Sequence, residues 1–272
     1  MKNRKSEFDG CDSLLNDNPR NQFDPTKIRW FNTFDISQYF RFIIALNWIR
    51  EIFSEDTTIK RRRIGDFGCS HSQLYNYWRN NCNFFYWPRI TYYGVDADEK
   101  RMTEDARRIN PKRHDNIFHF VQDLTEPFKL GHLCDIIVCM EVLEHVIVKK
   151  APALIKNILN NLLPNGYAIM SSPNPKRSEG EQFAWANESR FNHHYEWPFE
   201  EAKALVKECG FRVIKKSGVM PHRRFYSHSK HKELYRKLKE IYPPSIASNI
   251  LCGVDGTGLT RDWIILLKRE VK

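Results

Sequence analysis

The segment DIIVCMEVLEHV, residues 135–146, runs from an apolar stretch directly into two carboxylates and an imidazole. If Glu141 opens a helical turn, Glu144 at i+3 and His145 at i+4 lie on the same side of that turn. Two carboxylates in a partly desolvated cleft repel each other unless a cation neutralises them, and a divalent metal ion is the natural choice. A solvated helix start remains the alternative for these three residues alone, because the helix dipole favours glutamate in a first turn.

A second polar segment, ESRFNHHYEWPFEEA, contains the adjacent histidines His193 and His194 after the fifth predicted strand. A loop that follows this strand lies beside the end of the fourth strand, so one of these histidines can complete a set of two glutamates and two histidines. Such mixed oxygen and nitrogen ligands suit manganese, iron, cobalt or zinc at least as well as magnesium, which prefers oxygen. The candidate catalytic residues are therefore Glu141, Glu144, His145, His193 and His194.

A glycine-containing loop, within RIGDFGCSHSQL, connects a predicted strand to a predicted helix. Gly68 lets the backbone approach a ligand closely, and the helix N-terminus supplies free N–H groups. A simple tight turn is the alternative explanation for this glycine. The candidate cofactor-binding residues of the loop are Asp66, Phe67, Gly68 and Ser70.

Two acidic residues extend this candidate cofactor site. Asp96 ends the second predicted strand, where a carboxylate can bind the two hydroxyls of a ribose, and Asp123 follows the third strand, where it can meet an adenine. For Asp96 taken alone, a solvated carboxylate at a strand end is the alternative. The loop lacks the G-x-G-x-x-G pattern of dinucleotide sites, and one glycine is too few for a pyrophosphate. An adenosine cofactor without phosphates, such as S-adenosylmethionine, fits better.

Alternating strands and helices are expected to position these residues. Predicted strands cover residues 63–67, 90–95, 117–121, 135–140, 167–171, 211–215 and 263–268. Predicted helices cover residues 35–53, 72–80, 99–109, 149–163, 199–209 and 231–241. The segment GVDGTG, residues 253–258, is expected to be a flexible connection before the last strand. This alternation predicts parallel βαβ units and a doubly wound sheet whose ligands lie at the carboxyl ends of the strands.

Length and composition indicate one domain with a polar tail. The chain has 272 residues, of which 41% are apolar, and this is enough for one sizeable core. Residues 1–30 are polar and without periodicity, so we expect a flexible tail followed by a domain over residues 31–272.

Charge and cysteine content indicate the partner and the compartment. Lys and Arg number 43 against 33 Asp and Glu, a formal charge of +10, which favours nucleic acid as a partner, although plain solubility explains the same balance. Seven cysteines without a CxxC pair indicate reduced intracellular thiols rather than disulfides or a zinc site. No apolar run has the length of a signal peptide or a membrane span, so we expect a cytoplasmic protein without membrane association.

Three motifs together carry a resemblance to a known family. MEVLEHV after the fourth strand, SSPN at the end of the fifth and FNHHYEWPFEEA beyond it resemble the small-RNA 3′-terminal 2′-O-methyltransferases, which modify plant microRNAs and animal piRNAs. The likeness runs from about Ile64 to Cys209 and includes the paired motifs E-x-x-E-H and H-x-[YF]-E-W. It implies an α/β class I S-adenosylmethionine-dependent methyltransferase fold, Rossmann-like, with a mostly parallel seven-stranded sheet and helices on both faces.

The resemblance also assigns roles by position. The implied metal ligands are Glu141, Glu144, His145 and His193. His193 takes the fourth place because it stands three residues before Glu196, as the family's liganding histidine stands before its Glu-Trp pair, and His194 becomes a neighbour of the site or an RNA contact. The reversed assignment of the two histidines stays open.

Asp96 and Asp123 match cofactor-contacting positions of the family. The chain departs from many methyltransferases at Cys69 and Ser70, where those enzymes have a further glycine.

The activity implied is transfer of a methyl group from S-adenosylmethionine to the 2′-hydroxyl of the 3′-terminal nucleotide of small single-stranded guide RNAs of the piRNA or siRNA type, which protects their 3′ ends. The implied metal is magnesium or manganese, with cobalt or iron as alternatives, and it would act as positioner and Lewis acid. The proton acceptor is either His194 or water. A methyltransferase for a small metabolite and a catalytically silent RNA-binding module are the alternative functions.

Expected partners follow from the same resemblance. The chain is similar to the compact form of the family without double-stranded-RNA-binding modules, which implies a single-stranded small RNA 3′ end presented by an Argonaute- or Piwi-clade protein. We expect a monomer in the cytoplasm, including RNA granules. Basic runs at residues 60–63, 107–113 and 220–232 are candidate RNA contacts, with solvated faces as the alternative. The last run is favoured because charge and stacking surface combine in Arg223, Arg224, Phe225 and Tyr226.

Overall fold

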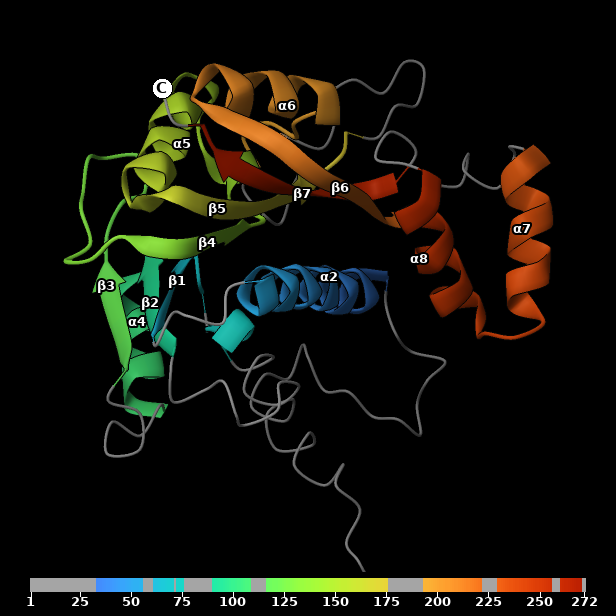
Figure 1. The fold of residues 1–272 in the computed structure, drawn as a ribbon, viewed down its shortest axis with the longest axis horizontal. Helices are drawn as coiled ribbons and strands as arrows, with labels where there is room; N and C mark the ends of the chain where they lie inside the picture. The colour runs from blue at the N-terminus through green and yellow to red at the C-terminus, as the bar shows by residue number, and fades with distance from the viewer. Residues whose placement is uncertain are drawn as a thin grey trace, which may run out of the picture.

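A seven-stranded sheet runs through the centre of the computed structural model (Figure 1). The structure describes residues 33–55, 61–70, 72–75, 90–108, 116–175, 193–221, 229–255 and 260–270. The strands are β1 (Arg62–Phe67), β2 (Ile90–Asp96), β3 (Ile117–Val121), β4 (Cys134–Met140), β5 (Leu162–Pro173), β6 (Phe211–Pro221) and β7 (Thr260–Arg269). Their spatial order is β3-β2-β1-β4-β5-β7-β6.

The strand order contains one switch point, between β1 and β4. From β1 the chain winds through β2 and β3 toward one edge, and β4 and β5 extend to the other side, all in parallel. Ligands of open α/β sheets bind at such a point, beyond the carboxyl ends of the strands. β7 is antiparallel to both β5 and β6. The prediction of a mostly parallel seven-stranded sheet is confirmed.

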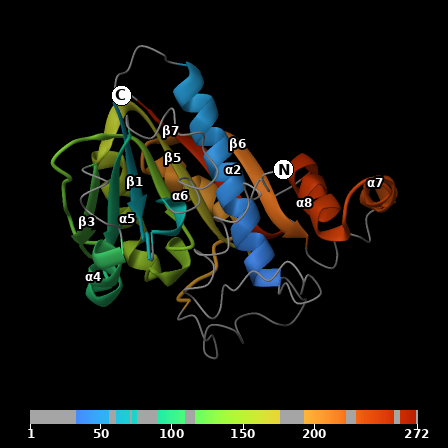
Figure 2. The same ribbon diagram turned by 90° about the horizontal axis from the view of Figure 1, so that it is seen from below.

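Helices cover both faces of the sheet (Figures 1 and 2). They are α2 (Thr33–Glu55), α4 (Glu99–Arg108), α5 (Ala151–Asn160), α6 (Phe199–Glu208), α7 (Ser229–Lys239) and α8 (Pro244–Asp255). On one face, α5 and α6 pack through a core that includes Leu154, Ile158 and Val206. On the other face, α2 crosses the strands and contributes Ile49 and Phe53 to a second core. No helix in the described ranges is long and apolar enough to cross a membrane.

The start of β5 differs from the prediction. Leu162 and Leu163, expected at the end of the helix over residues 149–163, and residues 164–166, expected as the connection to the next strand, belong to the strand, because Leu162 pairs with Cys134. The register then shifts before Tyr167 pairs with Ile136. Such an irregularity tolerates Pro164, which cannot donate a hydrogen bond to a regular ladder.

Helix α8 was not predicted. Pro244 begins it, and a proline is compatible with a first helical turn because the N–H that it lacks would have no intrahelical partner there. The expected flexible connection is therefore wrong for residues 253–255, which belong to α8, and residues 256–259 lie outside the described residues.

Helices α7 and α8 occupy the connection between β6 and β7. These neighbouring antiparallel strands could be joined by a tight hairpin, yet α8 packs beside β6 and α7 stands outside it (Figure 1). Asn249 fastens α8 to the strand: its Oδ1 accepts the Met220 N–H at 3.0 Å. β6 runs in the same direction as β5, so the α7–α8 pair leaves the sheet at the carboxyl edge.

Candidate functional site

The end of β4 places Glu141 at the rim of the sheet. Its φ of +56° lies in the left-handed region, which residues other than glycine rarely adopt. Two hydrogen bonds fix it to β5: the Glu141 N–H donates to the Ser171 carbonyl at 3.1 Å, and the Ser171 hydroxyl donates to Glu141 Oε1 at 2.8 Å. A sparsely populated backbone conformation held in this way is a feature of functional sites.

A short 3-10 turn, η4 (Leu143–His145), follows this strand end. Leu143 is buried and anchors the turn, Glu144 is only 1% exposed, and His145 is exposed. The prediction that Glu141 opens the helical turn is wrong. The turn begins two residues later, because a left-handed backbone cannot continue into a right-handed helix.

Backbone hydrogen bonds bring the His193 segment to η4. The N–H groups of His194 and Tyr195 both donate to the Glu144 carbonyl, at 2.7 and 3.2 Å. The His193 ring packs edge to face against the His145 ring, with centroids 4.8 Å apart. His193 Nδ1 lies 3.2 Å from Glu196 Oε1, which fixes the orientation of the ring.

Three of the four predicted metal ligands converge. Glu144, His145 and His193 each offer one ligand atom, and these atoms lie within 4.8 Å of one another. Both carboxylate oxygens of Glu144 are buried, and within the described part of the chain neither accepts a hydrogen bond of normal geometry; the Ser172 hydroxyl and the Glu144 N–H lie close enough only to lower its pKa against the effect of burial. This arrangement fits a divalent cation, because a cation would satisfy the buried carboxylate and because mixed oxygen and nitrogen donors suit a transition metal.

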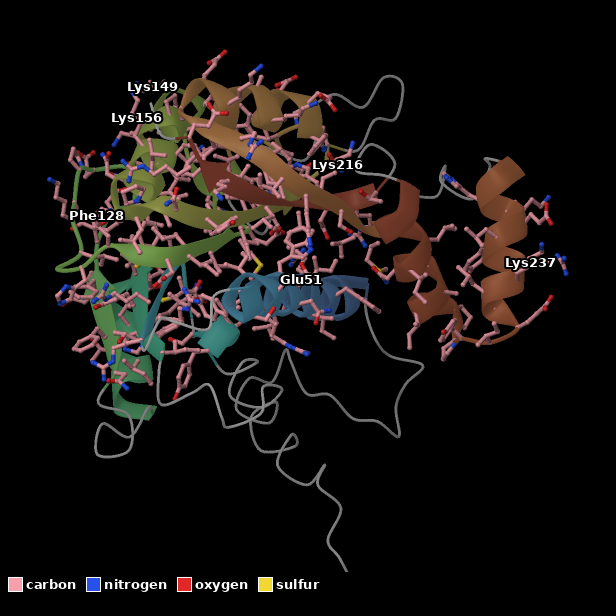
Figure 3. The ribbon with its side chains drawn as sticks, in the orientation of Figure 1. Glu51, Phe128, Lys149, Lys156, Lys216 and Lys237 are labelled. Atoms are coloured by element: carbon pink, nitrogen blue, oxygen red, sulfur yellow. The ribbon has the colours of Figure 1, made fainter. Side chains whose placement is uncertain are left out.

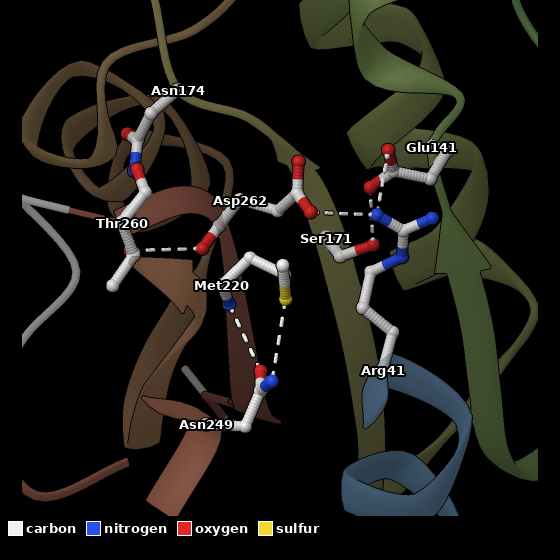
Figure 4. Close-up of polar contacts among 8 residues, drawn as sticks. All are labelled: Arg41, Glu141, Ser171, Asn174, Met220, Asn249, Thr260 and Asp262. Carbon is white, nitrogen blue, oxygen red and sulfur yellow. Dashed lines mark hydrogen bonds and ion pairs between the residues drawn. The ribbon is translucent and has the colours of Figure 1, made fainter. Parts of the chain in front are cut away.

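Glu141 lies outside this three-residue group, and Arg41 of α2 contacts it. Arg41 Nη1 is 3.2 Å from Glu141 Oε2 and 2.9 Å from Asp262 Oδ2 at the start of β7 (Figure 4). Sequence reasoning missed both Arg41 and Asp262. The available signal was an arginine inside the apolar run YFRFIIAL, because a buried arginine requires a carboxylate partner.

The glycine-containing loop after β1, here called the candidate cofactor loop, packs against Val142, the residue that precedes η4. Gly68 has φ +77°, and a Cβ atom at this position would lie 2.2 Å from Val142 Cγ2. Its N–H donates to the Val95 carbonyl at 2.7 Å, which ties the loop to β2. The glycine is thus required both by the turn and by its contact with the neighbouring segment.

Asp96 closes the other side of this loop. Its Oδ2 accepts the Ser70 N–H at 2.8 Å, and its Oδ1 accepts the Asp98 N–H at 3.0 Å. The carboxylate is half-buried rather than fully solvated, and it links the ends of β1 and β2. Carboxylate oxygens have further lone pairs, so this position remains suited to ribose hydroxyls.

The other candidate cofactor residues are less directly placed. Asp66 is buried and accepts the Tyr92 hydroxyl at 2.5 Å, and the Phe67 side chain is fully buried against Phe128 in the core. A cofactor contact by Phe67 therefore falls to its backbone. Asp123 is exposed and accepts both the N–H and the hydroxyl of Thr125 at 2.8 Å, and these bonds lower the pKa of its carboxyl.

Comparison with known proteins decides the family. A family model described as a methyltransferase domain matches residues 37–216, well over half of the chain. The chain belongs to this methyltransferase family. No curated protein is significantly similar to the sequence.

Solved structures of methyltransferases share the fold. The magnesium protoporphyrin IX methyltransferase of Synechocystis PCC 6803 is 14% identical, with a TM-score of 0.55 over 87% of this chain and 84% of that one. The N-methyltransferase NodS of Bradyrhizobium japonicum, with bound S-adenosyl-L-homocysteine, is 13% identical, with a TM-score of 0.53 over 97% and 99%. The small RNA methyltransferase HEN1 is 18% identical, with a TM-score of 0.56 over 86% of this chain and 25% of that one. The class I methyltransferase fold is confirmed, and the family supports S-adenosylmethionine as the cofactor.

The two glutamates at the rim of the methyltransferase sheet have raised carboxyl pKa values. Burial, and then the charge of Glu141, raise the pKa of Glu144 well above its ordinary value. Burial also raises the pKa of Glu141 to about 7, opposed by Arg41 and reinforced by Asp262. Both carboxylates therefore favour a proton or a bound cation in the folded protein.

The remaining predicted site residues are His194 and the RNA contacts at residues 223–226. His194 is exposed and contributes its backbone, not a ligand atom of the three-residue group. Residues 222–228, with the predicted RNA contacts Arg223, Arg224, Phe225 and Tyr226, lie outside the described residues, as does the predicted tail at 1–30.

Proposed function

We propose that this methyltransferase transfers the methyl group of S-adenosylmethionine to the 2′-hydroxyl of the 3′-terminal nucleotide of small single-stranded RNAs, in a metal-dependent reaction. The supporting observation is the buried Glu144 carboxylate, which accepts no hydrogen bond of normal geometry within the described residues, beside two imidazoles and next to the candidate cofactor loop. Carboxylate and imidazole groups that can hold a metal ion lie next to the expected position of the methyl-carrying cofactor. This arrangement suits a substrate whose oxygens can bind the same ion. The 3′ end of RNA offers two vicinal hydroxyls.

In this proposal Glu144, His145 and His193 hold a divalent ion such as magnesium or manganese. When bound, the ion supplies positioning and Lewis-acid activation for the terminal hydroxyls. Glu196 accepts a hydrogen bond from His193 Nδ1, which leaves Nε2 as the ligand atom and fixes the tautomer. His194, outside the donor set, is the proposed proton acceptor, with water as the alternative.

The cofactor loop contributes the second half of the arrangement. The Gly68 backbone and the Asp96 carboxylate hold the adenosine part of the cofactor at the switch point of the sheet. Because Gly68 packs against Val142, one residue before η4, the methyl donor and the ligand set are fixed relative to each other. Such fixed alignment contributes to methyl transfer by orienting the two reactants.

Positive charge supports RNA as the substrate. The chain carries a formal charge of +10, and α7, with its exposed lysines, leaves the sheet at the same edge as the site. A polyanionic strand gains affinity from such charges by release of counterions. Presentation of the RNA by an Argonaute- or Piwi-clade protein in the cytoplasm is part of the same proposal.

Transfer of labelled methyl groups to short single-stranded RNA tests this function. An RNA with a terminal 2′,3′-diol is compared with one whose last ribose is 2′-deoxy, with manganese, with magnesium and with a chelator. We expect label on the diol RNA alone, only with metal, and its loss in Glu144→Gln. The matched control is Glu126→Gln, which changes an exposed glutamate paired with Lys150 and retains activity.

Equal label on both RNAs contradicts terminal 2′-O-methylation. Label on small molecules of a cell extract but not on RNA favours the metabolite methyltransferase. Cofactor binding without any transfer favours the silent RNA-binding module.

A further inference from the structure

Arg41 is a buried cation next to the proposed metal site. It lies on α2, is 3% exposed, and its Nη1 contacts both Glu141 and Asp262 (Figure 4). Arginine is seldom buried to this degree unless carboxylates compensate its charge. Helix α2 precedes the first strand, so this contact brings an element from outside the strand–helix alternation into the site.

Three elements determine the orientation of the Glu141 carboxylate. Ser171 of β5 donates to Oε1 at 2.8 Å, Arg41 of α2 lies 3.2 Å from Oε2, and Asp262 of β7 fixes the arginine at 2.9 Å. The left-handed backbone conformation of Glu141 further restricts the directions in which its side chain can point. Each carboxylate oxygen still has a lone pair available for a cation.

The charges at this rim do not balance. Arg41 contributes one positive charge, whereas Glu141, Glu144 and Asp262 contribute three negative charges when ionised, and Arg41 interacts electrostatically with all three. Arg41 alone therefore leaves an excess of negative charge when these carboxylates are ionised, and a divalent ion would reduce it. Arg41 therefore orients the site without replacing the cation that the site requires.

We propose that Arg41 is the positioning residue that holds Glu141 as the fourth metal ligand, and that through it the docking of helix α2 and the binding of a divalent metal stabilise each other. This inference rests on the proposed metal-dependent function. Coupling between two events is reciprocal, so if docked α2 improves metal affinity, bound metal must stabilise docked α2 to the same extent.

Manganese affinity, measured by electron paramagnetic resonance of the free ion, tests the positioning role. Arg41→Lys keeps the charge but loses the planar fork, so it reports orientation rather than net charge. We expect manganese to bind about 10- to 100-fold more weakly, as for other groups that orient a metal ligand. Arg50→Lys, an exposed position on the same helix, is the control and leaves affinity unchanged.

A double variant separates positioning from a merely structural effect. Because Arg41 acts through Glu141, Arg41→Lys combined with Glu141→Gln should bind manganese no more weakly than Glu141→Gln alone. Additive losses would show that Arg41 acts elsewhere and would overturn the inference. If Arg41→Lys does not fold by circular dichroism, Asp262→Asn, which removes the anchor of Arg41, must give the same non-additive loss.

Hydrogen exchange of the α2 amides tests the reciprocal statement. In the unmodified protein, manganese should slow exchange across residues 41–53, and in Arg41→Lys this protection should disappear. The inference fails, while the proposed metal site stands, under three joint results. Manganese binds to the unmodified protein and this binding needs Glu144; Arg41→Lys and Asp262→Asn bind manganese as tightly as the unmodified protein; and manganese does not slow hydrogen exchange in α2. If the unmodified protein binds no manganese at all, both fail together, and methyl transfer to RNA remains to be judged by its own assay.

Discussion

At the scale of single residues, Gly68 meets two requirements at once. Its positive φ excludes most side chains, and the space for a Cβ atom is occupied by Val142, one residue before η4. A change at this glycine is therefore expected to affect both the candidate cofactor loop and the proposed metal ligands of η4.

Gly68→Ala should destabilise the protein by about 1–3 kcal/mol, because the left-handed backbone becomes strained and Val142 must move. It should also weaken binding of S-adenosyl-L-homocysteine, measured by calorimetry. Gly131→Ala is the control, because nothing lies within 4 Å of a Cβ atom added there. Equal stability and equal cofactor affinity in both variants would show that the loop is less constrained than its geometry indicates.

Glu141 and Glu144 give the metal-free protein a characteristic pH dependence. Both carboxyl groups have a higher pKa in the folded state than in the unfolded chain, so the folded state binds more protons at mildly acidic pH. Stability should therefore fall as pH rises above about 4.5, and for Glu141, whose pKa is about 7, the loss amounts to about 3 kcal/mol.

Thermal unfolding in the presence of a chelator, from pH 4.5 to 7.5, measures this loss. Glu144→Gln should flatten the profile and raise stability at neutral pH, because a neutral amide replaces a buried charge. Manganese should also flatten the profile of the unmodified protein. A profile that rises with pH would mean that both carboxylates are compensated by groups other than a metal.

At the scale of elements, the α7–α8 pair is an addition to the sheet at the edge that carries the site. Basic side chains on α7, such as Lys237, point away from α8 (Figure 3). Lys237 pairs with Glu233 at 3.2 Å, and both side chains are more than half exposed. Exposed pairs of this kind contribute little to stability. In the proposed complex, phosphates of the RNA can therefore replace Glu233 as the partner of Lys237.

Replacing Lys232 and Lys237 with glutamine should weaken RNA binding and make its salt dependence shallower. For single strands the slope of log affinity against log salt should change by about 0.7 for each phosphate that the protein no longer neutralises. Lys203→Gln on α6, an exposed lysine paired with Glu200, is the matched control. An unchanged slope in a fluorescence titration would remove α7 from the path of the RNA.

The central strands of the sheet were predictable because they are buried along nearly their whole length. β4 (CDIIVCM) is almost continuously apolar, which is the pattern of a covered parallel sheet, whereas β1 (RRIGDF) is buried in spite of its charged residues. The start of β5 and helix α8 were not predictable, because prolines at 164 and 244 resemble breaks. The strand accommodates Pro164 through a local register shift, and the helix accommodates Pro244 because the proline is its first residue. Both features are visible only in the folded chain.

At the scale of the whole molecule, the candidate site also combines residues whose placement could be predicted from the sequence with residues whose placement could not. Glu144 and His145 are adjacent in sequence, so their convergence could be predicted from a short motif. The predicted helical relation to Glu141 failed because backbone conformation at one residue decides it. Arg41 and Asp262 are 221 positions apart, and no local pattern relates them.

This separation also has a consequence for synthesis of the chain. Helix α2 leaves the ribosome early, whereas Asp262 is among the last of the described residues to emerge. A nascent chain can form β1 to β5 and the cofactor loop before that time, since domains begin to fold during translation. Arg41 gains its second carboxylate only when β7 has been made, so a chain truncated before β7 would lack the anchor that fixes Arg41 beside Glu141.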